Sequence, residues 1–148
     1  MIRALLTTVH AGTAAVWLGA MLYSLLVVQP RAMAALKDPE ALSVALAAGA
    51  RWKVISVCAV LAASGAGLIA VEDDATTAWS VLVALKVVLL AGALLLFSYV
   101  SWRLWPARLF ALLAELPAYR RRFRRVAYAL TAMVGVAFVL GTVADSIR

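Results

Sequence analysis

Apolar residues dominate four long stretches of this chain, and shorter polar segments separate them. The stretches run over Ala4–Val28, Val54–Val71, Ala78–Val100 and Val126–Ala144. Each has about the 18 residues or more that a helix needs to cross a hydrocarbon layer of about 30 Å. Since lipid offers no hydrogen-bond partners, such segments must be helical. The pattern predicts an all-α fold, a four-transmembrane-helix bundle that forms one integral membrane domain over residues 1–148. No internal repeat is evident in the sequence.

Composition agrees with this prediction, and charge adds an orientation. The chain is 66% hydrophobic and carries a net charge of +7. Four of its fourteen Lys and Arg residues lie between the first and second stretches, and seven lie between the third and fourth. The link between the second and third stretches, residues 72–77, contains none. By the positive-inside bias, both basic links are expected to be cytoplasmic loops and both termini to lie outside. We therefore expect a multi-pass membrane protein with periplasmic or extracellular termini.

A basic run precedes the fourth stretch, and two partners are conceivable for it. It consists of Arg120, Arg121, Arg122, Arg124 and Arg125, with Tyr119 and Phe123 among them. Basic runs with aromatic residues bind nucleic acid in other proteins. Its position directly before a membrane helix instead favours contact with anionic lipid headgroups. The expected partner is the lipid bilayer, and no nucleic acid is expected.

The links also contain local helix signals. Asp38-Pro39-Glu40 is typical of a helix start, with Asp38 as the cap and Pro39 in the first turn. The following run, Ala41–Ala48, either extends the second helix or lies along the membrane interface, with a break near Gly49. Later, Pro106 and Pro117 are expected to bracket a short amphipathic helix.

Small residues indicate where helices approach each other. Thr8, Gly12, Ala15 and Gly19 form one stripe of the first helix, and a second cluster contains Ser64, Gly65 and Gly67. Apolar side chains gain little by leaving lipid for one another, so close backbone approach is a main source of helix association. Packing alone accounts for these residues. The stripes also make a homodimer a candidate assembly.

His10, the single histidine, lies inside the first apolar stretch and is the main candidate for function. An ionisable side chain within a membrane needs partners and often marks a functional site. The helical rise places His10 about 9 Å and Lys86 about 12 Å from the outer ends of their helices. Lys86 either snorkels to the interface, loses its proton, or meets an anion or water-filled pocket. His10 either donates to a neighbouring backbone carbonyl or serves as a ligand, and Trp17 either packs or forms the floor of a pocket below it.

Acidic residues are predicted at the same end of the bundle. Glu72, Asp73 and Asp74 begin the outer link, and Asp145 ends the fourth helix. Together they predict an electronegative entrance suited to cations. Imidazole is the commonest protein ligand for transition metals, and carboxylates can complete a coordination shell. The candidate metal ligands are therefore His10, Glu72, Asp73 and Asp74. The residues expected to line the pocket or to pair with a bound ligand are Trp17, Lys86 and Asp145. The single cysteine, Cys58, lies toward the other face, where we expect a small buried apolar residue.

The spacing of these residues resembles the copper resistance protein D family. The likeness consists of His10, six residues, then Trp17-Leu18-Gly19 and an aliphatic run ending at Pro30, followed by Arg51, Gly65 and Lys86. It covers roughly Ala4–Val100. The resemblance implies a bacterial inner-membrane protein that handles copper, with His10 as the candidate ligand and Lys86 as the matching polar residue. A periplasmic metal-donor protein is an implied partner. The apolar stretches contain neither a second histidine nor a methionine cluster, so two copies of His10 in a homodimer are one way to complete the ligand set.

A second resemblance belongs to a different class, the bacterial four-helix protoporphyrinogen oxidase. That likeness implies haem b with His10 as an axial ligand and Lys86 paired with a propionate or substrate carboxylate. That family's arginine motif directly follows the first-helix glycine, whereas Pro30-Arg31 comes later in this chain. A non-catalytic assembly subunit and a solute or proton path along His10 and Lys86 are further alternatives. The sequence offers no catalytic serine, histidine and aspartate set and no phosphate-binding glycine loop, so no catalytic residues are predicted.

Overall fold

Four long apolar helices make up most of the protein. The computed structural model describes residues 1–35, 39–72, 76–112 and 114–146, without the side chains of residues 39–48 and 145–146. In these residues the regular structure is helical throughout, and no strand occurs. Four segments are long and apolar enough to cross a membrane: Ile2–Ala35, Gly49–Ala70, Thr77–Leu109 and Leu116–Ala144. The predicted all-α class with four membrane-length helices is confirmed, and the chain is a multi-pass membrane protein.

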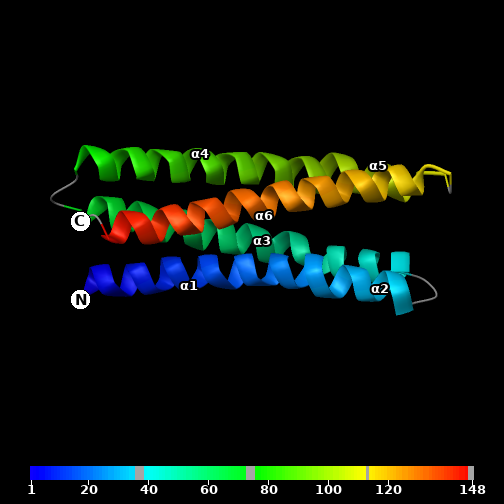
Figure 1. The fold of residues 1–148 in the computed structure, drawn as a ribbon, viewed down its shortest axis with the longest axis horizontal. Coiled ribbons are helices and arrows are strands. Elements are labelled where there is room, and N and C mark those ends of the chain that lie inside the picture. The colour runs from blue at the N-terminus through cyan, green and yellow to red at the C-terminus, as the bar shows by residue number, and fades with distance from the viewer. Residues whose placement is uncertain (36–38, 73–75, 113, 147–148) are drawn as a thin grey trace. The chain divides into compact units, whose positions relative to one another are not determined.

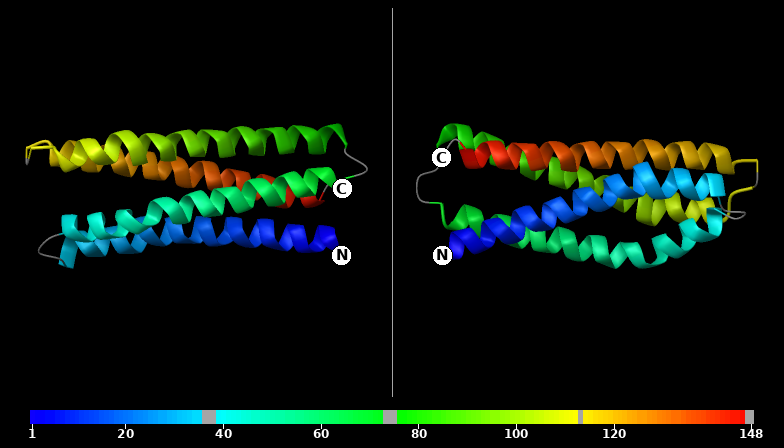
Figure 2. Two further views of the ribbon diagram at one scale, coloured as in Figure 1. Left: turned by 180° about the vertical axis from the view of Figure 1, so that it is seen from behind. Right: turned by 60° about the horizontal axis from the view of Figure 1, so that its bottom comes forward.

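The contacts divide the chain into two compact units, Met1–Ala75 and Thr76–Arg148. In the first unit, α1 (Ile2–Tyr23) continues through η1 (Ser24–Val28) into α2 (Gln29–Ala35), and α3 (Pro39–Ala70) returns along α1 (Figure 1). In the second unit, α4 (Thr77–Tyr99) continues through η2 (Val100–Leu104) into α5 (Trp105–Leu109). Here α6 (Leu116–Ser146) returns along α4 (Figure 2). Each unit is therefore an antiparallel helical hairpin.

A short π-helical segment interrupts the first long helix of each hairpin. In η1 the N–H of Gln29 donates to the Ser24 carbonyl five residues back, and in η2 Trp105 donates to Val100 in the same way. A proline follows each segment, Pro30 and Pro106. Proline has no N–H, and in a regular α-helix its ring collides with the carbonyl four residues earlier. The wider π turn places extra backbone there, so the helix continues past the proline.

The two hairpins form a structural repeat. Adding 76 to the residue numbers of η1, 24–28, gives those of η2, 100–104, and adding 76 to the end of α1 and of α3 gives the ends of α4 and α6. Three buried positions correspond under the same offset: Trp17 with Ala93, Leu25 with Ser101, and Cys58 with Val134. The expectation of no internal repeat was wrong because few residues are identical at matching positions. The repeat lies in the placement of helix interruptions and core positions.

The helices extend further than the apolar stretches. Pro39 is the first described residue of α3, and the helix continues from there to Ala70. The run Ala41–Ala48 therefore extends the second membrane helix, and the break expected near Gly49 was wrong. A single glycine weakens a helix by about 1 kcal/mol, which is too little to end one of this length. The proposed cap, Asp38, lies outside the described residues.

The link between α5 and α6 is a turn. The amphipathic helix expected between Pro106 and Pro117 was wrong, because Pro106 lies within α5 and Pro117 within the first turn of α6. Glu115 accepts a hydrogen bond from the Leu112 N–H through Oε2 at 3.1 Å, which closes the turn. The five arginines from Arg120 to Arg125 consequently lie on α6, as a helical extension beyond the apolar segment.

Small residues make close contacts on the second helix of the first hairpin. A Cβ added to Gly67 would lie 3.2 Å from both terminal methyl groups of Leu6, so the predicted packing role of this cluster is confirmed. The stripe on α1 differs. Thr8, Gly12, Ala15 and Gly19 are exposed, and among the described residues nothing lies within 4 Å of a Cβ added to either glycine. Within the first hairpin this stripe therefore does not pack on α3, because α1 turns Leu6 and His10 toward α3 instead.

Candidate functional site

His10 lies on the face of α1 that contacts α3. Its ring is partly buried, and its Nδ1 lies 2.9 Å from the Oγ of Ser64. Ser64 itself is 5% exposed and lies six residues before the end of the membrane-length part of α3, Gly49–Ala70. The first hairpin thus provides a polar contact inside its own helix pair. At Nδ1 the hydrogen-bond partner of His10 is therefore a side-chain hydroxyl.

The hydrogen bonds of Ser64 indicate which imidazole nitrogen carries the proton. The Ser64 hydroxyl lies 2.6 Å from the Val60 carbonyl and 3.3 Å from the Leu61 carbonyl, both one turn back on α3. A hydroxyl has a single proton, and the shorter distance assigns it to Val60. The Ser64 oxygen then accepts from the Nδ1–H of His10. In the neutral ring this tautomer leaves the lone pair on Nε2, the form in which histidine ligates metals.

Gly65 makes room for this arrangement. A Cβ added there would lie 3.2 Å from Cε1 and 3.7 Å from Nδ1 of His10, so any larger residue would press on the ring. Helix pairs in membranes use such small residues to bring backbones and polar groups together. Ser64 and Gly65 act jointly, since Ser64 accepts the hydrogen bond from the imidazole N–H and Gly65 lets the ring approach.

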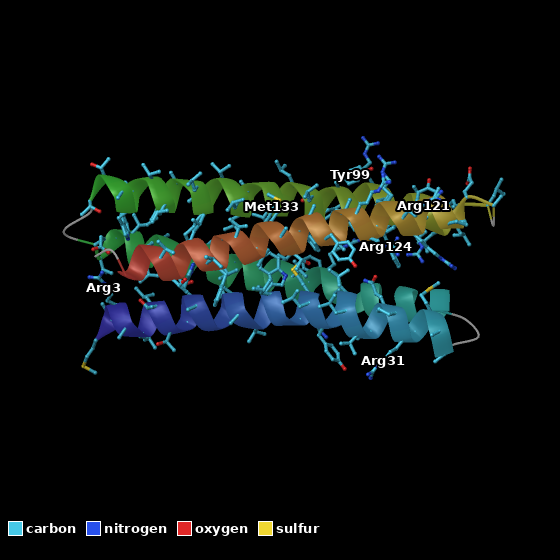
Figure 3. The ribbon with its side chains drawn as sticks, in the orientation of Figure 1. Arg3, Arg31, Tyr99, Arg121, Arg124 and Met133 are labelled. Atoms are coloured by element: carbon cyan, nitrogen blue, oxygen red, sulfur yellow. The ribbon has the colours of Figure 1, made fainter. Side chains whose placement is uncertain are left out.

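Glu72 is engaged by an arginine at the end of the same hairpin. The Nη2 of Arg3 donates to Oε2 of Glu72 at 3.1 Å and to Oε1 at 3.4 Å. The Glu72 side chain is 6% exposed, whereas that of Arg3 is 45% exposed, and Figure 3 labels Arg3 at the start of α1. The predicted cation-attracting carboxylate is therefore partly neutralised by a guanidinium. The pair also joins the first turn of α1 to the residues that follow α3.

Lys86 occupies the corresponding place in the second hairpin. A Cβ added to Gly141 would lie 3.2 Å from its Nζ and 3.7 Å from its Cε. The offset of 76 relates Lys86 to His10 and Gly141 to Gly65, so each hairpin lays one titratable side chain over one glycine. The Lys86 stem thus lies across α6, consistent with the tilt of helical side chains toward the N-terminus of their own helix.

The remaining predicted residues have mixed outcomes. Trp17 is buried, which agrees with a packing role two turns along α1 from His10. Cys58 is a buried free thiol, as predicted for a small apolar residue. Asp73 and Asp74 lie outside the described residues, and Asp145 lies in α6 with its side chain outside the description.

The donor set for a metal is incomplete in the part of the chain that the structure describes. No group of three or more His, Cys, Asp or Glu side chains there is placed to hold a metal ion. His10 therefore fits the role of one oriented ligand, and a bound copper ion would take its other ligands from outside this set. Haem b would need only one protein ligand for its iron, and His10 could supply it.

Comparisons with known proteins add no assignment. No family model matches the chain, and neither a curated protein nor a solved structure matches it.

Sequence reasoning assigned Ser64 a packing role only and missed its hydrogen bond with His10. A usable signal is the antiparallel register. Two contacts share the same antiparallel register: Arg3 with Glu72, and His10 with Gly65. His10 is seven residues after Arg3, and Gly65 is seven residues before Glu72. Arg3 is the only charged side chain before the first apolar stretch, and Glu72 is the first acidic residue after the second. If these two are assumed to form an ion pair, the register places Ser64 and Gly65 opposite His10.

Proposed function

We propose that this protein handles copper in the bacterial inner membrane and accepts the ion through Nε2 of His10. One observation carries the proposal: the hydrogen bond between His10 Nδ1 and Ser64 Oγ, with the serine proton directed to Val60. Histidines that ligate metals usually donate their other ring N–H to a fixed acceptor, which orients the ring and strengthens the ligand. The resemblance to the copper resistance protein D family supports the same choice of residue and metal.

Charge supports an extracytoplasmic location for His10. The described helices carry Arg31, Arg51 and Lys53 in the first hairpin toward the end opposite the N-terminus, and Arg103 and Arg108 lie toward the corresponding end of the second. The positive-inside bias assigns these ends to the cytoplasm. His10, near the start of α1, then lies toward the periplasmic side, where a metal-donor protein could deliver copper.

A second ligand is required, and a second copy of the chain is the simplest source. Imidazole suits copper, but a single nitrogen does not hold the ion firmly. Two copies of His10 in a homodimer would supply two equivalent nitrogens, and a periplasmic donor protein would provide the incoming ion. We assign Glu72 to its ion pair with Arg3, since metal binding by this carboxylate would require that pair to open.

Haem binding is the second candidate, and the same hydrogen bond favours it. One oriented imidazole is a sufficient axial donor for haem b, so this group needs no second protein ligand. Under this alternative His10 would hold the iron, and the haem would supply redox chemistry. The protein would resemble the membrane protoporphyrinogen oxidases in its function as well as in its residues.

An absorption spectrum with metal analysis of the purified protein tests both candidates. Copper handling predicts bound Cu(I) after anaerobic reconstitution, at one ion for each pair of chains in the homodimer. A Soret band in the protein as purified would instead establish haem. If a folded sample shows no copper binding and no Soret band, both candidates are contradicted. The assembly-subunit alternative then remains.

Replacing Ser64 with alanine is expected to lower copper affinity about tenfold to a hundredfold, the usual cost of removing the outer partner of a ligating histidine. The measurement is competition for Cu(I) with a chromogenic chelator. Ser56→Ala is the matched control, because Ser56 lies on the same helix and its hydroxyl donates to the Trp52 carbonyl at 3.0 Å, while its side chain is exposed. Equal affinities for the two variants would contradict the role given to Ser64.

A further inference from the structure

A hollow lined by three arginines lies on the second hairpin. Its volume is about 440 Å³, and Ala118, Arg121, Arg122 and Arg125 line it. All four residues belong to the first turns of α6, which precede the apolar part of that helix. Figure 3 labels Arg121 and Arg124 on this part of α6, at the end of the hairpin that α4 reaches at Tyr99. The lining is thus strongly cationic at one end of a membrane helix pair.

The three guanidinium groups have no neutralising carboxylate within the described residues. Neither Arg121, Arg122 nor Arg125 forms an ion pair there. Glu115, the nearest acidic residue in the sequence, uses its carboxylate to close the turn before α6. Like charges brought together repel one another, so a cluster of this kind is stabilised by an anion from outside the chain.

Aromatic residues hold part of the cluster in place. The guanidinium carbon of Arg122 lies 5.5 Å from the centre of the Tyr99 ring. On α5, Arg108 does not line the hollow, but its guanidinium carbon lies 5.5 Å from the centre of the Trp105 ring and 5.2 Å from that of Phe123, which follows Arg122. Cation–π contacts of this kind fix an arginine and reduce the entropy lost when it binds an anion.

The first hairpin shows that the helix pair does not need these arginines. Under the offset of 76, Arg121, Arg122 and Arg125 correspond to Ala45, Leu46 and Gly49. Tyr99 corresponds to Tyr23, which is 62% exposed. The same hairpin architecture is therefore built without the cluster, so its arginines serve a purpose other than helix packing.

The position of the hollow identifies the class of anion. The apolar part of α6 begins at Val126, directly after the last arginine, and exposed Trp102 lies at the same end of the hairpin on η2. Aromatic residues of this kind gather at the headgroup level of a bilayer, where lipid phosphates lie. A single arginine guanidinium can donate two parallel hydrogen bonds to the oxygens of one phosphate. We propose that Arg121, Arg122 and Arg125 form a site for the phosphate of an anionic phospholipid.

The test compares two double variants with the same loss of charge. Arg121→Gln with Arg125→Gln removes two arginines from the hollow, while Arg103→Gln with Arg124→Gln removes two exposed arginines that do not line it. Titration of dioleoylphosphatidylglycerol into the detergent-solubilised full chain, followed by native mass spectrometry, measures bound lipid. Each basic residue near a membrane surface contributes about fivefold to the attraction of anionic lipid, and direct contacts add to this. We expect the hollow variant to bind the lipid about tenfold more weakly than the control variant.

Three outcomes are decisive. The expected difference, with dioleoylphosphatidylcholine bound equally weakly by all forms, supports the site. Equal weakening in the two double variants would overturn it in favour of general charge attraction. The assignment to a phospholipid would be overturned if the protein bound inorganic phosphate and showed no preference for phosphatidylglycerol over phosphatidylcholine. That result would indicate a site for a free anion. The substituted positions are exposed, and unchanged circular dichroism verifies folding. The result is independent of copper, because His10 is unaltered in every variant.

Discussion

Replacing His10 with alanine is expected to abolish high-affinity copper binding, with a loss greater than about a hundredfold. The reason is that this change removes the ligand itself, whereas loss of an outer hydrogen-bond partner costs about tenfold to a hundredfold. His10 is the single histidine of the chain, so the variant has no second imidazole to take its place. Competition with a Cu(I) chelator under anaerobic conditions measures the change.

Thr8→Ala serves as the control for this variant. Thr8 is exposed on the same helix, and its hydroxyl donates to the Ala4 carbonyl at 2.9 Å, so its removal deletes a polar group without altering the contact between α1 and α3. Copper affinity of Thr8→Ala should equal that of the original protein. An unchanged copper affinity in His10→Ala would refute copper binding at His10. A Soret band that is present in the original protein and lost only in His10→Ala would instead identify His10 as a haem ligand.

Replacing Gly65 with leucine is expected to destabilise the first hairpin by about 1–3 kcal/mol, the usual cost of overpacking. A Cβ alone would already lie 3.2 Å from the His10 ring, and the remaining carbons of leucine have to displace the ring or separate the helices. The imidazole then loses Ser64, so copper affinity should fall together with stability. Thermal unfolding in detergent and chelator competition measure the two effects.

Gly49→Leu provides the comparison on the same helix. Gly49 is exposed, and among the described residues nothing lies within 4 Å of a Cβ added there. Because leucine is a better helix former than glycine, this variant should be as stable as the original or slightly more so. If both leucine variants unfold at the same temperature and bind copper equally, the close approach at Gly65 has no energetic importance.

Much of the fold was predictable because the membrane imposes strong constraints. Long apolar runs must form helices, and this constraint predicted the four membrane-length helices. Helix ends were less predictable, since charged and aromatic residues are compatible with helices that project beyond the apolar layer. The turn between Leu109 and Leu116 illustrates this difficulty: two prolines suggested a separate helix, yet each is absorbed by a longer one.

The candidate site was predictable only in part. His10 stood out because an imidazole is rare within an apolar run, but its partner Ser64 is an ordinary small residue in sequence. The two residues are 54 positions apart, and only the register of the antiparallel pair brings them to 2.9 Å. The engagement of Glu72 by Arg3 was missed for the same reason, since the acidic residues were treated as one group and their individual contacts depend on the hairpin end.

The repeat of two hairpins also explains how one architecture can carry two different specialisations. A hairpin that crosses a bilayer twice begins and ends on the same side. A second hairpin that follows it along the chain therefore inserts in the same orientation as the first. One copy can then change while the other retains the scaffold. In this chain the first copy has the imidazole over its glycine, and the second has an amine there together with the arginine hollow. The two hairpins thus hold a candidate metal ligand and a candidate lipid anchor on separate helix pairs within 148 residues.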